Sequence, residues 1–357
     1  MANSKEGFNL RRLASHHLFL PILALVLMMV INFILSPSFF SITINNGVLY
    51  GSLIDVMNRA SELIILAIGM TLVTAASGGQ DISVGAIMAV TAAVVTQILS
   101  GGEVSVSQYQ NSIVLALGAG LLAGMLCGAF NGFLVAKMKI QPMVATLILY
   151  TAGRGIAQLI THGQITYIRV DAYKIPGNYI SGIPIPTPII ISTVVAVIAF
   201  VILKKTALGL FIAGVGMNSS AARLVGLNES RIKIIVFVIN GFLAGIAGFI
   251  ASSRIYSADA NNIGLNIEMD AILAVALGGN LLSGGKFSLM GSIIGAYTIQ
   301  ALTTTLYSLN VSADRLPVYK AIVVLAIVIA QSDTVQKSVK QLFANYKKTL
   351  TKVQGEV

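Results

Sequence analysis

Long apolar segments separated by short polar ones make up most of this 357-residue chain. A transmembrane helix needs about 20 mainly apolar residues, and within a bilayer only helices and closed barrels satisfy their own backbone. The apolar segments lack the period of two that marks barrel strands, so the pattern predicts an all-α membrane bundle of about ten helices. The expected helices lie at 18–36, 60–77, 82–99, 112–136, 142–162, 187–203, 232–252, 269–279, 287–307 and 316–332.

Two of the apolar regions are interrupted by glycine pairs and polar residues. The first interruption reads SGGQDISVGA from Ser77 to Ala86, and the second reads LGGNLLSGGKF from Leu277 to Phe287. Transporters use broken helices of this kind to line a cavity. We therefore expect helix breaks near residues 77–82 and 278–287. The glycines expected to form them are Gly78, Gly79, Gly85, Gly278, Gly279, Gly284 and Gly285.

Asp81 lies in the middle of the first break. An ionised carboxylate at the centre of a bilayer costs roughly 2.5–3.5 kcal/mol on the insertion scale. A carboxylate that accepts backbone amides at the positive end of a helix offsets part of this cost. We therefore interpret Asp81 first as a cap for a helix that begins near Ile82, and only second as a group that faces a transport pathway.

Composition and charge place the chain in a membrane and orient it there. Hydrophobic residues make up 56% and charged residues 10% of the chain, with a mean hydropathy of +0.86, whereas soluble proteins carry about 25% charged residues. Basic residues cluster in alternate loops, which predicts ten crossings with both termini in the cytoplasm. The expected organisation is a cytoplasmic tail at 1–17, one transmembrane domain at 18–332 with a cytoplasmic loop at 204–231, and a basic cytoplasmic tail at 333–357.

The net charge is +10, but its basic residues lie mainly in alternate loops beside apolar segments. A lipid bilayer is therefore expected as a partner and a nucleic acid is not.

The sequence contains few residue patterns typical of enzymes or of metal and nucleotide sites. LGGNLLSGGKF fails as a phosphate-binding loop, because that motif needs glycine at Asn280 and a hydroxyl at Phe287. No metal-ligand spacing and no Gly-x-Ser-x-Gly motif occurs. We expect no enzyme activity, no cofactor and no metal, so any ATPase that drives transport is a separate chain.

Two polar loops are candidates for recognition. In the segment 204–233, Asn218 or Ser219 is expected to start a short amphipathic helix that ends near Gly226, which suits either docking of a partner protein or a solvated connector. The segment SADANNIGLNIEMDA, Ser257 to Ala271, is dense in Asp and Asn. It suits recognition of sugar hydroxyls, docking of a soluble partner, or an ordinary wet loop.

Together these motifs resemble, over nearly the whole chain, the permease subunits of bacterial ABC importers for ribose, galactose, xylose and arabinose. SGGQDISVGA is similar to the Gly-Gly-Ile-Asp-Leu-Ser-Val-Gly signature of that family, with Gln80 and Ile82 in place of isoleucine and leucine. GVGMNSSAARLVGLN is similar to its coupling-helix loop, and LGGNLLSGGKF to its Gly-Gly…Gly-Gly-Arg segment, with Lys286 in place of arginine. The resemblance is strongest to the galactofuranose permease subunits, through the segments MNRA (57–60), IQPMVATLIL (140–149), AGRGIAQLIT (152–161), KTALG (205–209) and ADANNIGL (258–265).

The resemblance implies a partner set and a location. In the bacterial inner membrane, a second permease subunit, identical or paralogous, would complete the pathway, and a periplasmic sugar-binding protein would deliver a monosaccharide. An ATP-binding-cassette ATPase subunit would dock on the cytoplasmic loop. The residues that would couple to it are Gly216, Asn218, Ala221, Ala222, Arg223 and Gly226, and those that would dock the binding protein are Asp259, Asn261 and Asn262.

A neutral sugar calls for hydrogen-bonding groups at membrane depth. The polar residues expected to line its pathway are Gln80, Asp81, Ser83, Asn131, Gln158, Asn240 and Asn280. For the isolated amides, a hydrogen bond between packed helices is an equal alternative. Arg154 is expected to pair with a carboxylate that the sequence does not identify. The rival functions are an ion-coupled secondary sugar transporter with Asp81 as the carrier carboxylate, and a scaffold subunit without transport.

Overall fold

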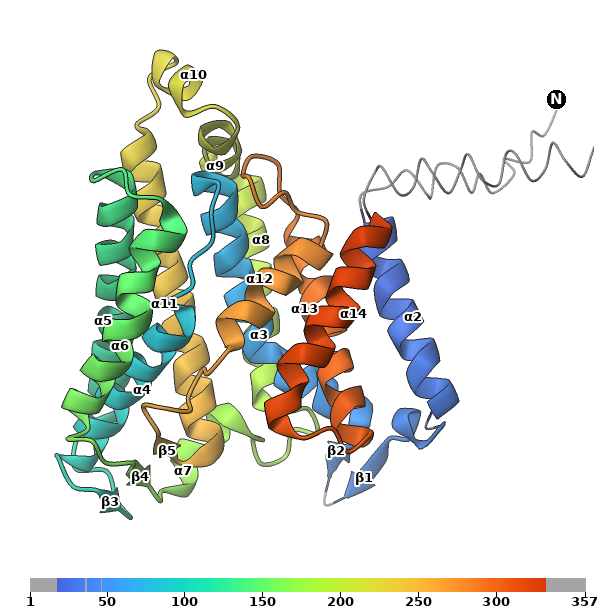
Figure 1. Ribbon diagram of the computed structural model, residues 1–357. Helices are drawn as coiled ribbons and strands as arrows, with labels where there is room; N and C mark the ends of the chain where they lie inside the picture. Colours follow the sequence, from blue (N-terminus) through green and yellow to red (C-terminus); the bar gives the residue numbers. More distant parts are fainter. Residues whose placement is uncertain (1–17, 36, 46, 332–357) are drawn as a thin grey trace, which may run out of the picture.

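The computed structural model describes residues 18–35, 37–45 and 47–331, so the expected tails at 1–17 and 333–357 lie outside the described residues. The described part is an all-α bundle with a few short strands (Figure 1). Its α-helices are α2 (Phe19–Leu35), α3 (Ser52–Ser77), α4 (Val84–Ser100), α5 (Ile113–Ala136), α6 (Pro142–Ile160), α7 (Asp171–Lys174), α8 (Thr187–Lys205), α9 (Leu208–Met217), α10 (Ser219–Leu224), α11 (Glu229–Ile255), α12 (Ile267–Leu277), α13 (Leu289–Ser308) and α14 (Leu316–Gln331).

A helix occupies the position of every expected apolar segment. Among the described helices, α3, α5, α6, α8 and α11 are long and apolar enough to cross a membrane. One helix is clearly longer than the hydropathy pattern predicts. α3 begins at Ser52 rather than near residue 60, and Arg254 of α11 donates to the Asn58 oxygen at 3.2 Å and pairs with Glu62 at 2.9 Å in its first half. α12 is as short as the expected segment, with 11 residues that span about 16 Å, roughly half of the hydrocarbon core.

Glycine faces allow the long helices to pack backbone against backbone. α5 packs along α11, and Gly124 and Gly128 of α5 face the carbonyl oxygens of Gly241 and Phe237 of α11. A Cβ atom on Gly124 would lie 2.6 Å from the Gly241 oxygen, which is closer than side chains approach. Glycines recur every four residues in α5, at Gly120, Gly124, Gly128 and Gly132, and all four pack on α4 or α11 of the same chain, as small residues do between membrane helices.

Short strands and turns lie at the end of the bundle opposite α10 (Figure 1). β1 (Thr43–Asn45) and β2 (Val48–Tyr50) form an antiparallel hairpin. β3 (Ser105–Val106), β4 (Thr166–Ile168) and β5 (Ser257–Ala258) form a sheet in that order, parallel between β3 and β4 and antiparallel between β4 and β5. Three single turns of 3₁₀ helix complete the described elements: η1 (Pro37–Phe40), η2 (Ile175–Gly177) and η3 (Ala313–Arg315).

The N-terminal ends of α4 and α12 meet inside the bundle. Segments of bends and turns lead to the two helices from opposite ends of the molecule (Figure 1). Gly85, in the first turn of α4, packs so closely on Gly264 that a Cβ on Gly264 would lie 2.8 Å from the Gly85 oxygen. Both helices are therefore half-helices that start within the protein, an arrangement found in transporters.

The glycine packing predicts opposite effects of the same substitution at two positions of α5. Gly128→Ala forces a methyl group against the Phe237 carbonyl, and overpacking of this kind costs about 1–3 kcal/mol. Gly118→Ala meets no atom within 4 Å and is expected to leave stability unchanged or raised by about 0.5–1 kcal/mol. Thermal unfolding of the two variants in detergent measures the difference. Equal melting temperatures for both variants would contradict the close α5–α11 contact.

Candidate functional site

Asp81 is the centre of a buried hydrogen-bond cluster in the first break. α3 ends at Ser77 with Gly78 in the left-handed conformation at φ 67°, and α4 begins at Val84. The Asp81 carboxylate accepts hydrogen bonds from the Ser83 amide at 2.9 Å, from the Ser83 hydroxyl at 2.6 Å, and from Asn240 Nδ2 at 2.8 Å. Asp81 thus accepts the amide of Ser83, the N-cap residue of α4, whose own side chain makes no capping hydrogen bond. The helix starts two residues later than Ile82, and the role of Asp81 as its cap stays a prediction.

The Asp81 cluster consists of Asp81, Ser83, Asn131 and Asn240. Asn131 Nδ2 donates to Ser83 Oγ at 2.8 Å, so the cluster joins α5 and α11 to the start of α4. All four side chains are fully buried. In this structure each one fills a contact inside the protein, and the expectation that they line a pathway stays a prediction.

The second break folds around Asn280. Its Nδ2 donates to the Val275 oxygen at 3.1 Å and to Ser292 Oγ at 2.9 Å, and its Oδ1 accepts from the Ser288 amide. Gln80 Nε2 in turn donates to the Leu282 oxygen at 3.3 Å, which connects the two breaks. Gln80 and Asn280 are each 8% exposed, so they also act mainly within the protein.

Most of the predicted break glycines lie where the helices are interrupted. Gly78, Gly279, Gly284 and Gly285 have positive φ angles, which favour glycine, and Gly79 and Gly278 lie beside them. Gly85 is the exception, because it lies in the first turn of α4, where its missing side chain admits the segment that leads to α12.

Residues 259–266, which we call the re-entrant segment, turn back into the bundle from β5 to α12. Arg154 of α6 holds it, with Nη1 at 3.1 Å from the Ala260 oxygen, 3.0 Å from the Asn261 oxygen and 3.1 Å from the Ile263 oxygen. The hydrogen bonds of Arg154 thus go to backbone carbonyls. Among the described residues Arg154 forms no salt bridge, but the carboxylate of Glu268 interacts electrostatically with it. One side of this segment is therefore bound to a helix through its backbone, while Asn261 and Asn262 are exposed.

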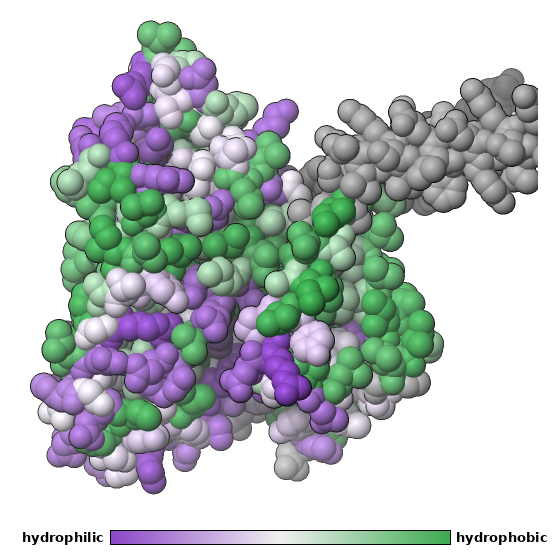
Figure 2. All heavy atoms as spheres, in the orientation of Figure 1, coloured by the Kyte–Doolittle hydropathy of each residue, from purple (hydrophilic) through white to green (hydrophobic). Residues whose placement is uncertain are grey.

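A row of polar side chains follows the same contact. Gln158 Nε2, one turn beyond Arg154, donates to Asn261 Oδ1 at 2.5 Å. Asp259 in turn accepts from the Asn261 amide at 2.9 Å and from Asn262 Nδ2 at 2.6 Å. The side chains of Gln158, Asn261 and Asn262 are exposed. Figure 2 shows hydrophilic residues around a hollow between the α6 side and the α14 side of this face.

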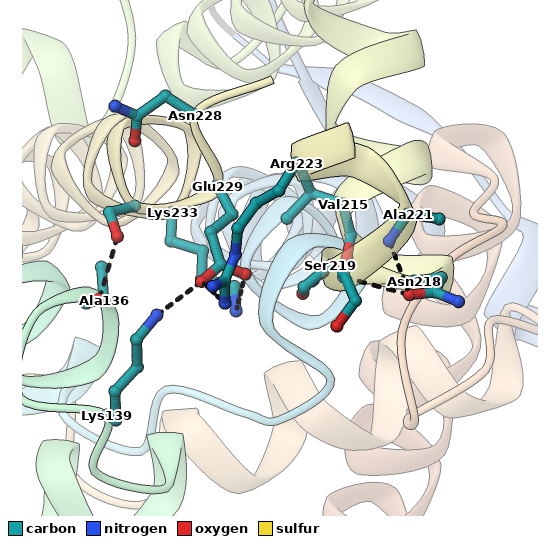
Figure 3. Close-up of polar contacts among 12 residues, drawn as sticks. Ala136, Lys139, Val215, Asn218, Ser219, Ala221, Arg223, Asn228, Glu229 and Lys233 are labelled. Atoms are coloured by element: carbon teal, nitrogen blue, oxygen red, sulfur yellow. Dashed lines mark hydrogen bonds and ion pairs between the residues drawn. The ribbon is translucent and has the colours of Figure 1, made fainter. Parts of the chain in front are cut away.

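The predicted coupling loop forms a protruding helical turn at the opposite end of the molecule (Figures 1 and 3). Asn218 Oδ1 accepts the amides of Ser220 and Ala221 at 3.0 Å each, which caps α10. Gly226 follows the helix with a φ of 85°. Ala222 is buried, whereas the side chains of Leu224 and Val225 are 89% and 77% exposed. Asn218, Ala222 and Gly226 therefore set the shape of a turn whose apolar tip is open.

Glu229 anchors this turn to the bundle (Figure 3). Its Oε1 lies 2.6 Å from Arg223 Nη2 of α10 and 2.5 Å from Lys139 Nζ of the α5–α6 loop, and its Oε2 lies 3.8 Å from Lys233 Nζ. The Glu229 side chain is only 5% exposed. It borders a cavity of about 490 Å³ lined by Lys139, Arg223, Gly226, Leu227, Asn228, Glu229 and Ser230.

Sequence reasoning missed Glu229 and Lys139. Glu229 is the one acidic residue among the basic residues of the 204–233 segment, and this local imbalance was the available signal. Its contact with Lys139 spans 90 positions in the chain and leaves no such signal.

Gly216 fixes α9 against the end of α3 and the second break. A Cβ on Gly216 would overlap the Ala75 oxygen of α3 and would lie 2.7 Å from the Gly285 amide. The Gly285 amide donates to the same Ala75 oxygen at 2.9 Å. The base of the coupling turn is thus in van der Waals contact with the end of α3 and with the second break.

Removal of the Asn218 cap is expected to loosen α10 alone. Asn218→Ala deletes the acceptor of two amides, which costs about 1 kcal/mol. Hydrogen exchange at Ser220 and Ala221 should become about fivefold faster. Ser220→Ala, whose hydroxyl makes no side-chain contact that the structure records, is the control and should leave exchange at Ala221 unchanged. Unchanged exchange in Asn218→Ala would remove the capping assignment.

Comparisons with known proteins agree with these features. Residues 52–331 match the family described as branched-chain amino acid transport system / permease component. No solved structure matches the chain.

Among curated relatives, the galactofuranose transporter permease protein YtfT of Escherichia coli (strain K12) is 44% identical over 87% of this chain and 88% of its own length. The fructose import permease protein FruF of Bifidobacterium longum is 36% identical over 96% of this chain and 94% of its own length. The ribose import permease protein RbsC of Escherichia coli (strain K12) is 38% identical over 87% of this chain and 92% of its own length. The chain therefore belongs to this family of membrane transport permeases, as an integral membrane protein whose relatives are sugar permeases of ABC importers.

Proposed function

We propose that this chain is the transmembrane permease subunit of an ABC importer for a monosaccharide, with galactofuranose favoured over ribose, arabinose, xylose and galactose. The 44% identity to a galactofuranose permease over 87% of the chain carries the choice of sugar. In this proposal a periplasmic binding protein delivers the sugar, and a separate ATPase subunit supplies the energy.

The shape of α10 supports docking of an ATPase subunit. Leu224 and Val225 expose apolar side chains at the tip of a capped turn, and a soluble partner would remove this surface from water. Exposed apolar residues grouped at one place mark interaction sites. In the proposal, Gly216, Asn218, Ala222 and Gly226 shape the turn, while Ala221 and Arg223 lie on it.

The charge of the α10 end supports a cytoplasmic location for it. The basic residues of this end are Lys137, Lys139, Lys204, Lys205, Arg223, Arg231, Lys233 and Lys286. Loops rich in Lys and Arg stay in the cytoplasm. With ten crossings, both termini would then be cytoplasmic and residues 18–332 would form one transmembrane domain in the bacterial inner membrane.

The sugar pathway in this proposal follows the exposed polar row at α6 and the re-entrant segment. Gln158, Asn261 and Asn262 offer amide groups to sugar hydroxyls beside the hollow of Figure 2. A second permease subunit would close this face. Asp259, Asn261 and Asn262 would then receive the sugar where the binding protein delivers it. The buried Asp81 cluster, Gln80 and Asn280 would act indirectly, by fixing the half-helices that border the pathway.

The ion-coupled alternative has less support. A carrier carboxylate must exchange its proton or ion with water or substrate during each cycle. Asp81 is fully buried and its carboxylate accepts three hydrogen bonds from protein groups. Relatives at 36–44% identity are named as permeases for sugars, and the α10 turn would have no role without an ATPase.

The docking assignment predicts a loss of assembly when the α10 tip becomes polar. Leu224→Ser removes an apolar anchor, whose loss at an interface centre costs about 2 kcal/mol, so co-purification of the ATPase subunit and sugar uptake should both fall by roughly tenfold or more. Arg231→Gln, an exposed change in the first turn of α11, is the control. A Leu224→Ser permease that retains its ATPase and full uptake would contradict docking at α10.

The energy source separates the importer from the ion-coupled alternative. Uptake of labelled galactofuranose into cells that express the permease with its ATPase and binding protein should stop when ATP is depleted and persist when the proton gradient is dissipated. Asp81→Asn, which keeps the size of the side chain, should keep this ATP dependence. Uptake that follows the proton gradient in the wild type, and loses that dependence in Asp81→Asn, would support the secondary transporter. Ribose and fructose as competitors test the choice of sugar.

A further inference from the structure

We infer that Glu229 is a positioning residue that ties the coupling turn α10 to α6, so that α6 carries a displacement of α10 to the re-entrant segment. The inference rests on the proposed function, because it assumes that an ATPase moves α10. It adds a route through named side chains from the docking turn to the polar row beside the hollow.

The first link lies between α10 and the start of α6. One oxygen of Glu229, Oε1, contacts both Arg223 of α10 and Lys139. Lys139 has a φ of 59° and lies three residues before Pro142, the first residue of α6. The charged ends of Lys139 and Arg223 contact the same oxygen of Glu229. When the two charged ends move apart, one of these two ion pairs is stretched or broken.

The burial of Glu229 makes this link strong enough to matter. Exposed ion pairs contribute about 0–1 kcal/mol, but the Glu229 side chain is only 5% exposed whereas Lys139 and Arg223 are 55% and 60% exposed. A buried charge that loses a partner is costly. Separation therefore leaves the Glu229 carboxylate with little water to replace its partners, whereas Lys139 and Arg223 remain hydrated.

The second link runs along α6 itself. Gly79 of the first break packs directly on Pro142, and the Ile82 amide donates to Thr146 Oγ1 at 3.1 Å. Arg154 lies about 18 Å along the helix from Pro142, at 1.5 Å per residue. It donates to three carbonyls of the re-entrant segment, and Gln158 donates to Asn261. α6 thus contacts the first break near one end and the re-entrant segment near the other.

A continuous set of contacts does not alone demonstrate energetic coupling, so the experiment measures it. The complex of permease, ATPase and binding protein is reconstituted in proteoliposomes, and the sugar transported per ATP hydrolysed is recorded. Glu229→Gln and Lys139→Gln should each lower this ratio by about fivefold or more, the lower end of usual coupling energies. The double variant should be no worse than Glu229→Gln alone, because Lys139 has already lost its ion-pair partner in that variant. Lys139→Arg keeps the charge and should restore most of the ratio.

A second readout follows the re-entrant segment directly. Leu265 is 50% exposed, and Cys127 is the single cysteine of the chain, so Leu265→Cys in a Cys127→Ser background reports accessibility to a thiol reagent. The labelling rate should differ about threefold or more between nucleotide-free and vanadate-trapped complexes. Glu229→Gln should abolish this difference, whereas the control Arg231→Gln should preserve it.

The outcomes separate the two proposals. A wild-type complex without ATP-driven sugar transport contradicts the proposed function, and with it the inference. A wild-type complex that transports, with Glu229→Gln and Lys139→Gln variants that match its ratio or lose it additively, contradicts only the role of Glu229. If Glu229→Gln fails to fold, as melting temperature shows, the exposed Lys139 carries the test through Lys139→Gln and its rescue by Lys139→Arg.

Discussion

The interrupted backbone within the bundle must find all of its hydrogen-bond partners in the protein. Bilayer hydrocarbon offers none, and each unsatisfied amide or carbonyl costs several kcal/mol there. Two side chains meet much of this requirement. Arg154 binds three carbonyls of the re-entrant segment, and Asp81 accepts the Ser83 amide. The paths of α4 and α12, and so the shape of the polar face between them, depend on these contacts.

Close glycine contacts connect the first break, the second break and α9. Gly78 packs on the backbone of Ser283, and Gly216 packs on Ala75 and Gly285, so the two breaks and the base of α9 touch one another without intervening side chains. Dense packing of this kind transmits displacement rather than absorbing it. The ion pairs of Glu229 add a polar connection at the same end. At this end of the molecule, α9 is thus held by close backbone packing and α10 by ion pairs.

The positions of the helices and of both breaks were predictable, because hydropathy and glycine pairs are local signals. The surroundings of the polar residues were not. Asn131 and Asn240 lie among apolar residues, as an amide that lines a pathway also would. Their actual partners, Ser83 and Asp81, lie 48 and 159 positions away in the chain, so the local sequence does not reveal them. Arg154 was expected to pair with a carboxylate, but its hydrogen bonds go to carbonyls, which every residue possesses and which no sequence pattern marks. Glu229 depends on Lys139, 90 residues earlier.

The pairing of Asp81 with Asn240 has a consequence for the assembly of the chain in the membrane. The two residues are 159 positions apart, so the ribosome completes α3 and α4 long before α11 exists. During that interval the carboxylate lacks its hydrogen bond from Asn240, and the start of α4 lacks its contact with α11. The order of synthesis therefore differs from the order of packing. The first break therefore reaches its final geometry only after the second half of the protein has been inserted. Until then, the polar groups of the first break must be kept away from lipid by something other than α11.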